Sequence, residues 1–203
     1  SKDICDNQPE AKVLIVSIEL CSLHLQQEKT EDNLLAHSLF GDGAAALVVS
    51  GNPNTEKPKL QVLSSSSQLL MNGMNDMAWQ IGNTGFQMAL TTYVPRIIEG
   101  GIKALCHQMF AKNQLDMSAI DAFAIHPGGK KILESIEKEL GITKLQNQHA
   151  YETLKNFGNM SSPTVIFVLK QSWANMTDIP DRHIFSLAFG PGLTMESVLF
   201  RTA

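Results

Sequence analysis

Runs of apolar and β-branched residues alternate with polar stretches along the 203-residue chain. We expect buried strands at Lys12–Ile18 (KVLIVSI) and Ala44–Val49 (AAALVV), because continuous apolar runs are typical of strands covered on both faces. Further strands are expected at Leu60–Ser67 and at Ile120–Ile125, and the latter ends at His126.

The end of the chain predicts a β-hairpin. His183–Phe189 and Leu193–Phe200 alternate apolar and polar positions on either side of Gly190-Pro191-Gly192. Because strands and helices alternate elsewhere, the whole pattern predicts an α/β chain with a mixed β-sheet.

Helical spacing of apolar residues indicates the remaining elements. It predicts one or two helices within Gln87–Phe110, an amphipathic helix at Lys131–Leu140 closed by Gly141, and helices at Ala150–Asn156 and Thr164–Met176. The polar segment Gln26–Asn33 is expected to be a loop, and residues 72–85 show no clear period.

One segment predicts a domain boundary. Residues 51–58 (GNPNTEKP) contain two prolines among turn-forming residues, which is typical of a linker. We therefore expect residues 1–50 and 59–203 to belong to different halves of the fold.

Composition narrows the class of protein. The chain is 43% hydrophobic and carries a net charge of −4, so it has enough apolar residues for a core and too little positive charge for nucleic acid. Three cysteines without a C-x-x-C pair favour reduced thiols and a cytoplasmic protein. No apolar run is long enough for a membrane span. The chain begins at Ser1 without a helix start signal, and we expect it to be a fragment of a longer protein.

Two polar residues next to glycines are candidates for catalysis. His126 follows a buried strand and precedes Pro127-Gly128-Gly129, and Asn159 lies in GNMSS just before a predicted helix. A His and an Asn that donate hydrogen bonds to one point form an oxyanion hole, which suits acyl transfer. Each residue alone is more simply explained as structural. Asp42, in FGDGAAA, is expected to hold a turn.

Four segments together resemble the type III polyketide synthases, the chalcone synthase-like family of the thiolase fold. They are FGDGAAA (Phe40–Ala46), HPGG (His126–Gly129), GNMSS (Gly158–Ser162) and FGPGLTMES (Phe189–Ser197), in the family's order and at roughly its spacing. The resemblance implies one half of a five-layered αβαβα arrangement, with residues 1–50 as the tail of the other half. It also implies a homodimer for the intact protein.

The resemblance implies a decarboxylative Claisen condensation of an acyl-CoA starter with malonyl-CoA at a Cys-His-Asn site. His126 and Asn159 match the family's His and Asn, and the family's Cys falls upstream of Ser1. CoA thioesters are then the substrates, and neither a cofactor nor a metal site is expected. The family's substrate-cavity positions are matched by Phe40, Phe86, Glu19, Ser161, Gly190, Pro191 and Gly192.

Two alternatives stay open. A condensing enzyme similar to ketoacyl synthase III also uses Cys, His and Asn, although HPGG and GNMSS favour the polyketide branch. A thiolase-half module that acts by association, without chemistry, is the other alternative. As a fragment, the chain is expected to be inactive alone.

Overall fold

The computed structural model describes residues 1–28, 30–52, 59–74, 76–83, 85–90 and 94–203. Most of the predicted linker, 53–58, lies outside these residues. The larger sheet has the strand order β3-β8-β7-β6, formed by Leu60–Leu69, Thr194–Thr202, His183–Gly190 and Ala122–Ile125. Because β6 and β7 are parallel while β7–β8 and β3–β8 are antiparallel, the predicted mixed sheet is confirmed.

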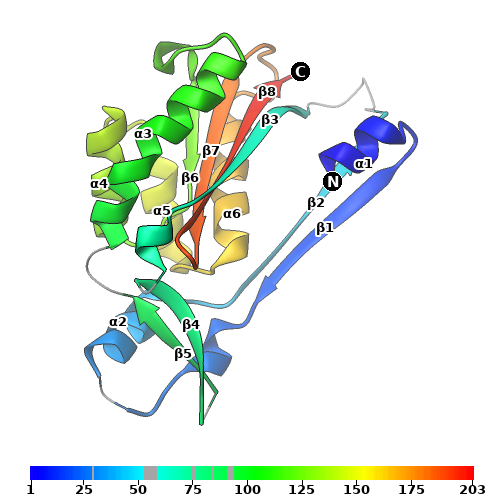
Figure 1. Cartoon of the computed structure of the whole chain (residues 1–203). Coiled ribbons are helices and arrows are strands. Elements are labelled where there is room, and N and C mark those ends of the chain that lie inside the picture. Colours follow the sequence, from blue (N-terminus) through cyan, green and yellow to red (C-terminus); the bar gives the residue numbers. More distant parts are fainter. Residues whose placement is uncertain (29, 53–58, 75, 84, 91–93) are drawn as a thin grey trace.

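Helices cover both faces of this sheet (Figure 1). On one side lie α3 (Val94–Lys112) and α4 (Lys130–Leu140), and on the other lie α5 (Gln148–Phe157) and α6 (Ser162–Ala174). The predicted hairpin at the end of the chain is also confirmed, because β7 and β8 pair across residues 191–193. Among the described residues, no helix is long and apolar enough to cross a membrane.

The hydrophobic core lies between the sheet and α3 and α4. One side of α3 buries Ile98, Ile102, Leu105 and Met109 at helical spacing, and the inner face of α4 buries Ile132, Leu133, Ile136 and Leu140 in the same way. Strand β7 contributes Ile184, Phe185 and Leu187 to this core. The buried strand predicted before His126 is confirmed, since Ala124 and Ile125 are fully buried in β6. This core holds the end of β6 rigidly at the edge where the site forms.

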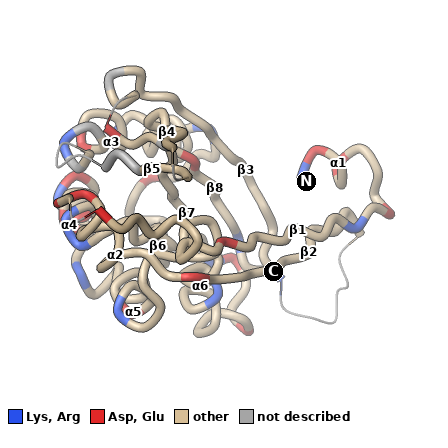
Figure 2. Tube along the Cα trace, turned by 90° about the horizontal axis from the view of Figure 1, so that it is seen from below, with Lys and Arg blue, Asp and Glu red and all other residues tan. Residues whose placement is uncertain are grey.

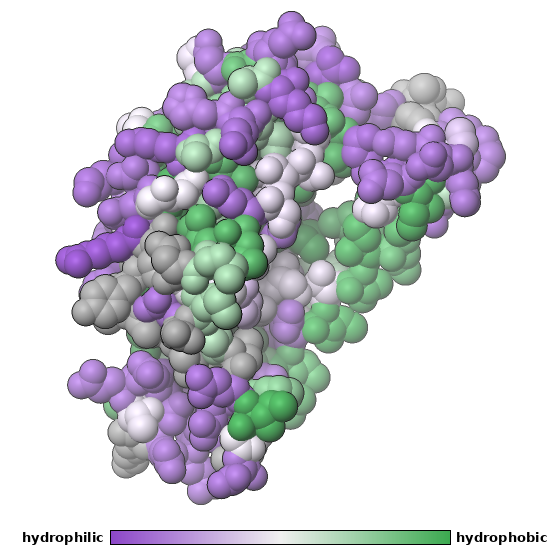
Figure 3. Space-filling model, in the orientation of Figure 1, coloured by the Kyte–Doolittle hydropathy of each residue, from purple (hydrophilic) through white to green (hydrophobic). Residues whose placement is uncertain are grey.

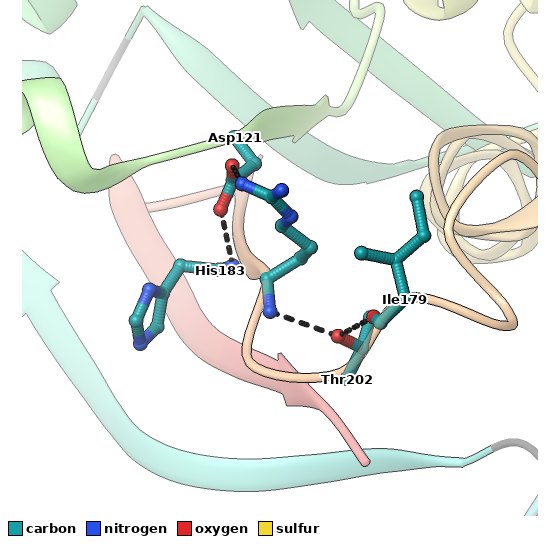
Figure 4. A network of polar contacts seen from close by, with 5 residues as sticks. Asp121, Ile179, His183 and Thr202 are labelled. Atoms are coloured by element: carbon teal, nitrogen blue, oxygen red, sulfur yellow. Dashed lines mark hydrogen bonds and ion pairs between the residues drawn. The ribbon is translucent and has the colours of Figure 1, made fainter.

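A polar network fixes the opposite end of the sheet (Figure 4). Asp121 accepts hydrogen bonds from the Arg182 guanidinium at 2.9 Å and from the His183 backbone N–H at 2.8 Å. The Thr202 hydroxyl donates to the Ile179 carbonyl at 2.6 Å and accepts from the Arg182 backbone N–H. The network therefore joins the start of β7 to the end of β8, next to β6.

A two-stranded ribbon lies beyond α6. Strand β1 (Lys12–Glu19) pairs antiparallel with β2 (Gly43–Ser50), and α6 contacts both strands as well as β6 and β7. The short helix α1 (Lys2–Asn7) also contacts the ribbon. The described part of the chain thus has the order helix, sheet, helix, ribbon across its layers.

The prediction that both ribbon strands are buried was wrong, because exposed and partly exposed residues alternate along β1 and β2 and neither strand has a fully buried residue. Leu14, Val16, Ile18 and Val48 all expose more than half of their surface, and Figure 3 shows apolar residues along this part of the molecule. Charged residues stand only at the ends of β1, so the ribbon is mostly uncharged in Figure 2. The apolar run correctly indicated a strand, but no described element covers the second face.

The segment between the ribbon and the core also differs from expectation. Residues 77–82 and 85–90 form an antiparallel pair, β4 (Met77–Gly82) and β5 (Gly85–Leu90), so the prediction of helix from residue 87 was wrong.

Helix α2 (Glu31–Leu39) replaces part of the predicted loop, because the Thr30 hydroxyl accepts a hydrogen bond from the Asn33 N–H and caps its start. Three short 3-10 turns complete the fold: η1 (Cys21–His24), η2 (Met71–Gly73) and η3 (Met117–Ala119).

Candidate functional site

The His126 side chain is held at the end of β6. Its backbone N–H donates to the Leu187 carbonyl of β7 at 2.8 Å, and the residue is only 7% exposed. Burial lowers the pKa of the His126 imidazole to about 4. The ring is therefore neutral at pH 7, and it carries one N–H donor and one acceptor nitrogen.

The Asn159 side chain lies beside the same turn. Its Nδ2 donates to the Gly128 carbonyl at 3.5 Å, while its Oδ1 accepts from the Ser161 N–H at 2.9 Å. A Cβ built on Gly128 would stand 3.9 Å from Nε2 of His126. The structure thus brings His126 and Asn159, 33 positions apart in sequence, next to the same residue, Gly128.

The backbone on both sides of Asn159 is bonded to the end of α2. The Asn159 N–H donates to the Leu39 carbonyl at 2.8 Å, and the Gly41 N–H donates to the Asn159 carbonyl at 3.0 Å. Phe40, between them, forms an isolated parallel bridge with Asn159. Small residues are required here, because a Cβ on Gly43 would approach Met160 Sδ to 2.5 Å and one on Gly41 would approach the Phe157 carbonyl to 2.7 Å. FGDG therefore serves as the close-packed partner of the Asn159 loop.

Two more of the predicted residues lie at the start of α6. Ser161 is the N-cap residue of α6 with a φ of 58°, and its side chain makes no capping hydrogen bond. Glu19, at the end of β1, accepts a hydrogen bond from the Ser162 hydroxyl at 2.6 Å. The ribbon and the Asn159 loop thus meet at this helix start.

The remaining predicted substrate-cavity residues lie in β5 and at the turn between β7 and β8. Phe86, in β5, is 48% exposed and contacts the His24 ring edge-on at 5.7 Å. Gly190, Pro191 and Gly192 connect β7 to β8, and the Gly192 N–H donates to the Met77 carbonyl of β4 at 3.2 Å. Neither group has a described contact with His126 or Asn159, so the structure joins them to the site only through neighbouring elements.

A cavity of about 360 Å³ opens next to Phe40. The η1 turn, α2 and the FGDG turn form its walls, with lining residues Cys21, Ser22, His24, Leu25, Gln26, Asn33, Ala36, His37, Phe40, Gly41 and Asp42. Sequence reasoning missed the residues from α2, although the Thr30 cap followed by Leu34 and Leu35 was a readable helix signal. Ser22 had no sequence signal, because its partner Asp42 is 20 positions away.

The three cysteines differ from an activated nucleophile. Partial burial, together with the negative charges of Glu19 and Asp42, raises the pKa of the Cys21 thiol. Burial raises the pKa of Cys106 to about 12, and Cys5 is 4% exposed with its thiol directed at backbone carbonyls. The thiolate is the reactive form, so the environments of Cys21 and Cys106 disfavour attack on a thioester.

Comparison with known proteins identifies the fold and the family. Residues 61–203 match the family "Chalcone and stilbene synthases, C-terminal domain" and residues 1–53 match "Chalcone and stilbene synthases, N-terminal domain". The crystal structure of the C-terminal type III polyketide synthase domain of "Steely1" from Dictyostelium superposes with a TM-score of 0.88 at 35% identity, covering 98% of this chain and 56% of that one. The thiolase-like α/β fold implied by the four motifs is confirmed.

Curated relatives agree with the structural match. The chain is 38% identical over 198 residues to "Alpha-pyrone synthesis polyketide synthase-like Pks18" of Mycobacterium tuberculosis, covering 95% of this chain and 50% of that protein. It is 34% identical over 204 residues to a "Putative chalcone synthase" of Bacillus subtilis, covering 98% and 56%. The chain thus spans about half the length of these relatives. From the family matches over most of its residues, the chain belongs to the chalcone and stilbene synthases, the type III polyketide synthases.

Proposed function

We propose that the intact protein is an acyltransferase that condenses an acyl-CoA starter with malonyl-CoA by decarboxylative Claisen condensation. The observation that carries this proposal is the burial of His126 and Asn159 next to the same residue, Gly128. Loss of CO2 leaves negative charge on the malonyl thioester oxygen, and two donors in a water-poor site stabilise that charge far better than bulk water does.

The state of His126 supports the donor role. A buried imidazole with a pKa of about 4 stays neutral at physiological pH, so it donates one N–H without carrying a charge. Asn159 is 3% exposed, and its Oδ1 is already occupied by the Ser161 N–H. That bond fixes the amide so that Nδ2, the donor end, faces the Gly128 turn.

The nucleophile in this proposal is a cysteine in a segment before Ser1. Support comes from the raised pKa values of the Cys21 and Cys106 thiols and from the half of the relatives' length that this chain does not cover. We propose that residues 1–50 and 59–203 are parts of two thiolase halves. CoA thioesters are the only small molecules that the proposed reaction requires, and the intact protein is proposed to be a homodimer in the cytoplasm. The three free cysteines suit a reducing compartment.

The substrate cavity is proposed to lie around Phe40, with Glu19 and Ser161 at the start of α6 and Phe86 beyond His24. The cavity beside Phe40 and the ring contact between Phe86 and His24, which itself lines that cavity, support this arrangement. Gly190, Pro191 and Gly192 are proposed as the wall on the side of β4, since Gly192 is bonded to Met77.

The test is malonyl-CoA decarboxylation by the intact protein. His126→Ala and Asn159→Ala are each expected to lower the rate at least about 100-fold, because each removes one donor to the developing oxyanion. His149→Ala and Asn175→Ala are matched controls, since both residues lie outside the site. A loss of less than about tenfold in either site variant would remove that residue from the oxyanion hole.

A second measurement tests the absence of a nucleophile among residues 1–203. The 1–203 chain, mixed with acyl-CoA and analysed by peptide mass spectrometry, is expected to show no acyl group on Cys21 and to form no product. Starter-dependent acylation of Cys21 with product formation would place the nucleophile on this chain instead.

A further inference from the structure

The η1 turn, Cys21–His24, forms one wall of the cavity beside Phe40, and burial does not hold it there. None of its four residues is buried, and Leu23 is 74% exposed. Segments with few buried apolar contacts open at low free-energy cost, so polar contacts must set their position. Ser22 provides such a contact at the centre of the turn.

Ser22 makes two hydrogen bonds to one carboxylate. Its backbone N–H donates to Oδ1 of Asp42 at 2.8 Å, and its hydroxyl donates to Oδ2 at 2.6 Å. Two bonds to two oxygens fix both the distance and the orientation of the turn. The two bonds also hold the pKa of Asp42 below its usual value, so the carboxylate stays charged at neutral pH.

Asp42 is itself held firmly from the other side. Gly41 is bonded to the Asn159 carbonyl, Phe40 bridges Asn159, and Gly43 packs against Met160 without room for a Cβ. The Asp42 carboxylate therefore projects from a backbone segment that is hydrogen-bonded to the Asn159 loop. Its negative charge also raises the pKa of the Cys21 thiol, which is next to Ser22. We infer that Asp42, through Ser22, is a positioning residue that fixes the η1 turn as a wall of the cavity beside Phe40.

This inference rests on the proposed function only for its kinetic consequence. Cys21 and His24 of the η1 turn line the cavity, so the position of the turn sets the space available to an acyl chain. The hydrogen bonds between the Asn159 backbone and residues 39 and 41 do not involve Ser22. Loss of the Ser22 hydroxyl should therefore change how the starter binds more than it changes decarboxylation of malonyl-CoA.

The first test reads the position of the wall without any catalysis. Peptide-resolved iodoacetamide labelling of the intact protein is expected to modify Cys21 at least about threefold faster in Ser22→Ala than in the wild type. Ser22→Thr keeps the hydroxyl and is expected to restore the wild-type rate. The buried Cys106 of the same molecules reports global opening, and its labelling is expected to stay unchanged.

Ser118→Ala is the matched control, because Ser118 also donates both its N–H and its hydroxyl to an exposed aspartate, Asp116, away from this cavity. It should leave Cys21 labelling at the wild-type rate. An unchanged Cys21 rate in Ser22→Ala overturns the inference. An equal rise at Cys21 and Cys106 also overturns it, because that result means general destabilisation.

The second test is kinetic. In Ser22→Ala the KM for the starter acyl-CoA is expected to rise at least about threefold more than the rate of malonyl-CoA decarboxylation falls. A parallel change in both would assign Ser22 a general structural role and contradict the inference. If the wild type fails to decarboxylate malonyl-CoA, the proposed function fails, and the labelling result still decides the role of Ser22 and Asp42.

Discussion

At the scale of single residues, the chemistry of this site depends on where two ordinary side chains are buried. His126 is enclosed at the end of β6, and no charged partner among the described residues compensates the loss of water, so its pKa falls. Asn159 is enclosed with its oxygen occupied and its nitrogen facing Gly128. Burial keeps the His126 imidazole neutral and orients the Asn159 amide. An oxyanion hole requires donors in these states.

The depressed pKa of His126 predicts a pH dependence of stability. The unfolded chain protonates this imidazole near pH 6.5 and the folded chain only near pH 4, so the unfolded state binds more protons between those values. Stability from this residue is complete above pH 6.5 and is lost as the pH falls toward 4. The loss amounts to roughly 3 kcal/mol.

Urea unfolding of the wild type and His126→Gln at pH 7 and pH 4 measures this contribution. Carboxylates titrate in both proteins, so only the difference between their profiles reports the imidazole. The wild type is expected to lose roughly 3 kcal/mol more than the variant on acidification. Parallel profiles would show that His126 is protonated as easily in the folded state as in the unfolded state.

At the scale of elements, adjacent glycines in the middle of α3 differ in their surroundings. A Cβ on Gly100 would meet nothing within 4 Å, whereas one on Gly101 would approach Met195 Cε to 2.7 Å and Leu70 Cδ1 to 2.9 Å. The helix is continuous from Val94 to Lys112, so Gly100 adds flexibility without a packing reason, and Gly101 allows α3 to approach β8.

Alanine substitutions should separate these two glycines. Gly100→Ala is expected to raise the free energy of unfolding by about 0.5–1 kcal/mol, because alanine loses less backbone entropy in a helix. Gly101→Ala gains the same entropy but must displace two side chains, so it is expected to be less stable than Gly100→Ala. Thermal or urea unfolding of both variants checks this, and equal stabilisation would contradict the packing shown here.

At the scale of the whole molecule, the ribbon β1–β2 has apolar residues on both faces and a covering layer on only one. Helices α1 and α6 contact the ribbon, while Leu14, Val16, Ile18 and Val48 each expose more than half of their surface on the described chain. Within the described part of the chain, no further strand pairs with either edge of this two-stranded sheet. Exposed apolar strands with free edges favour association.

Light scattering of the 1–203 chain is therefore expected to give an apparent mass that rises with concentration. Val16→Lys should reduce this rise, because it places a charge in the centre of the exposed face. Leu145→Lys is the matched control, since Leu145 is 74% exposed on another part of the chain. A monomeric mass at all concentrations, or an equal effect of both variants, would count against association through the ribbon.

The sequence by itself determined the strands of the larger sheet and of the ribbon, most helices and which side chains are candidates for the chemistry. Apolar runs fixed β1, β2, β6 and the β7–β8 hairpin, and the motifs around His126 and Asn159 indicated acyl transfer. These signals are local, because strand period, glycine turns and motif order can be read along the chain. Residues 87–90 were misread as helix because β5, with six residues, is too short to separate strand spacing from helical spacing.

Only the tertiary structure decided which residues meet. Three hydrogen-bonded pairs join positions that are 20 or more residues apart: Asn159 with Gly128, Ser22 with Asp42, and Glu19 with Ser162. It also decided which face of the ribbon is covered, because an apolar strand reads the same whether one layer or two pack on it. The sequence specifies side-chain chemistry, while proximity, burial and the resulting pKa of His126 arise only when the chain packs.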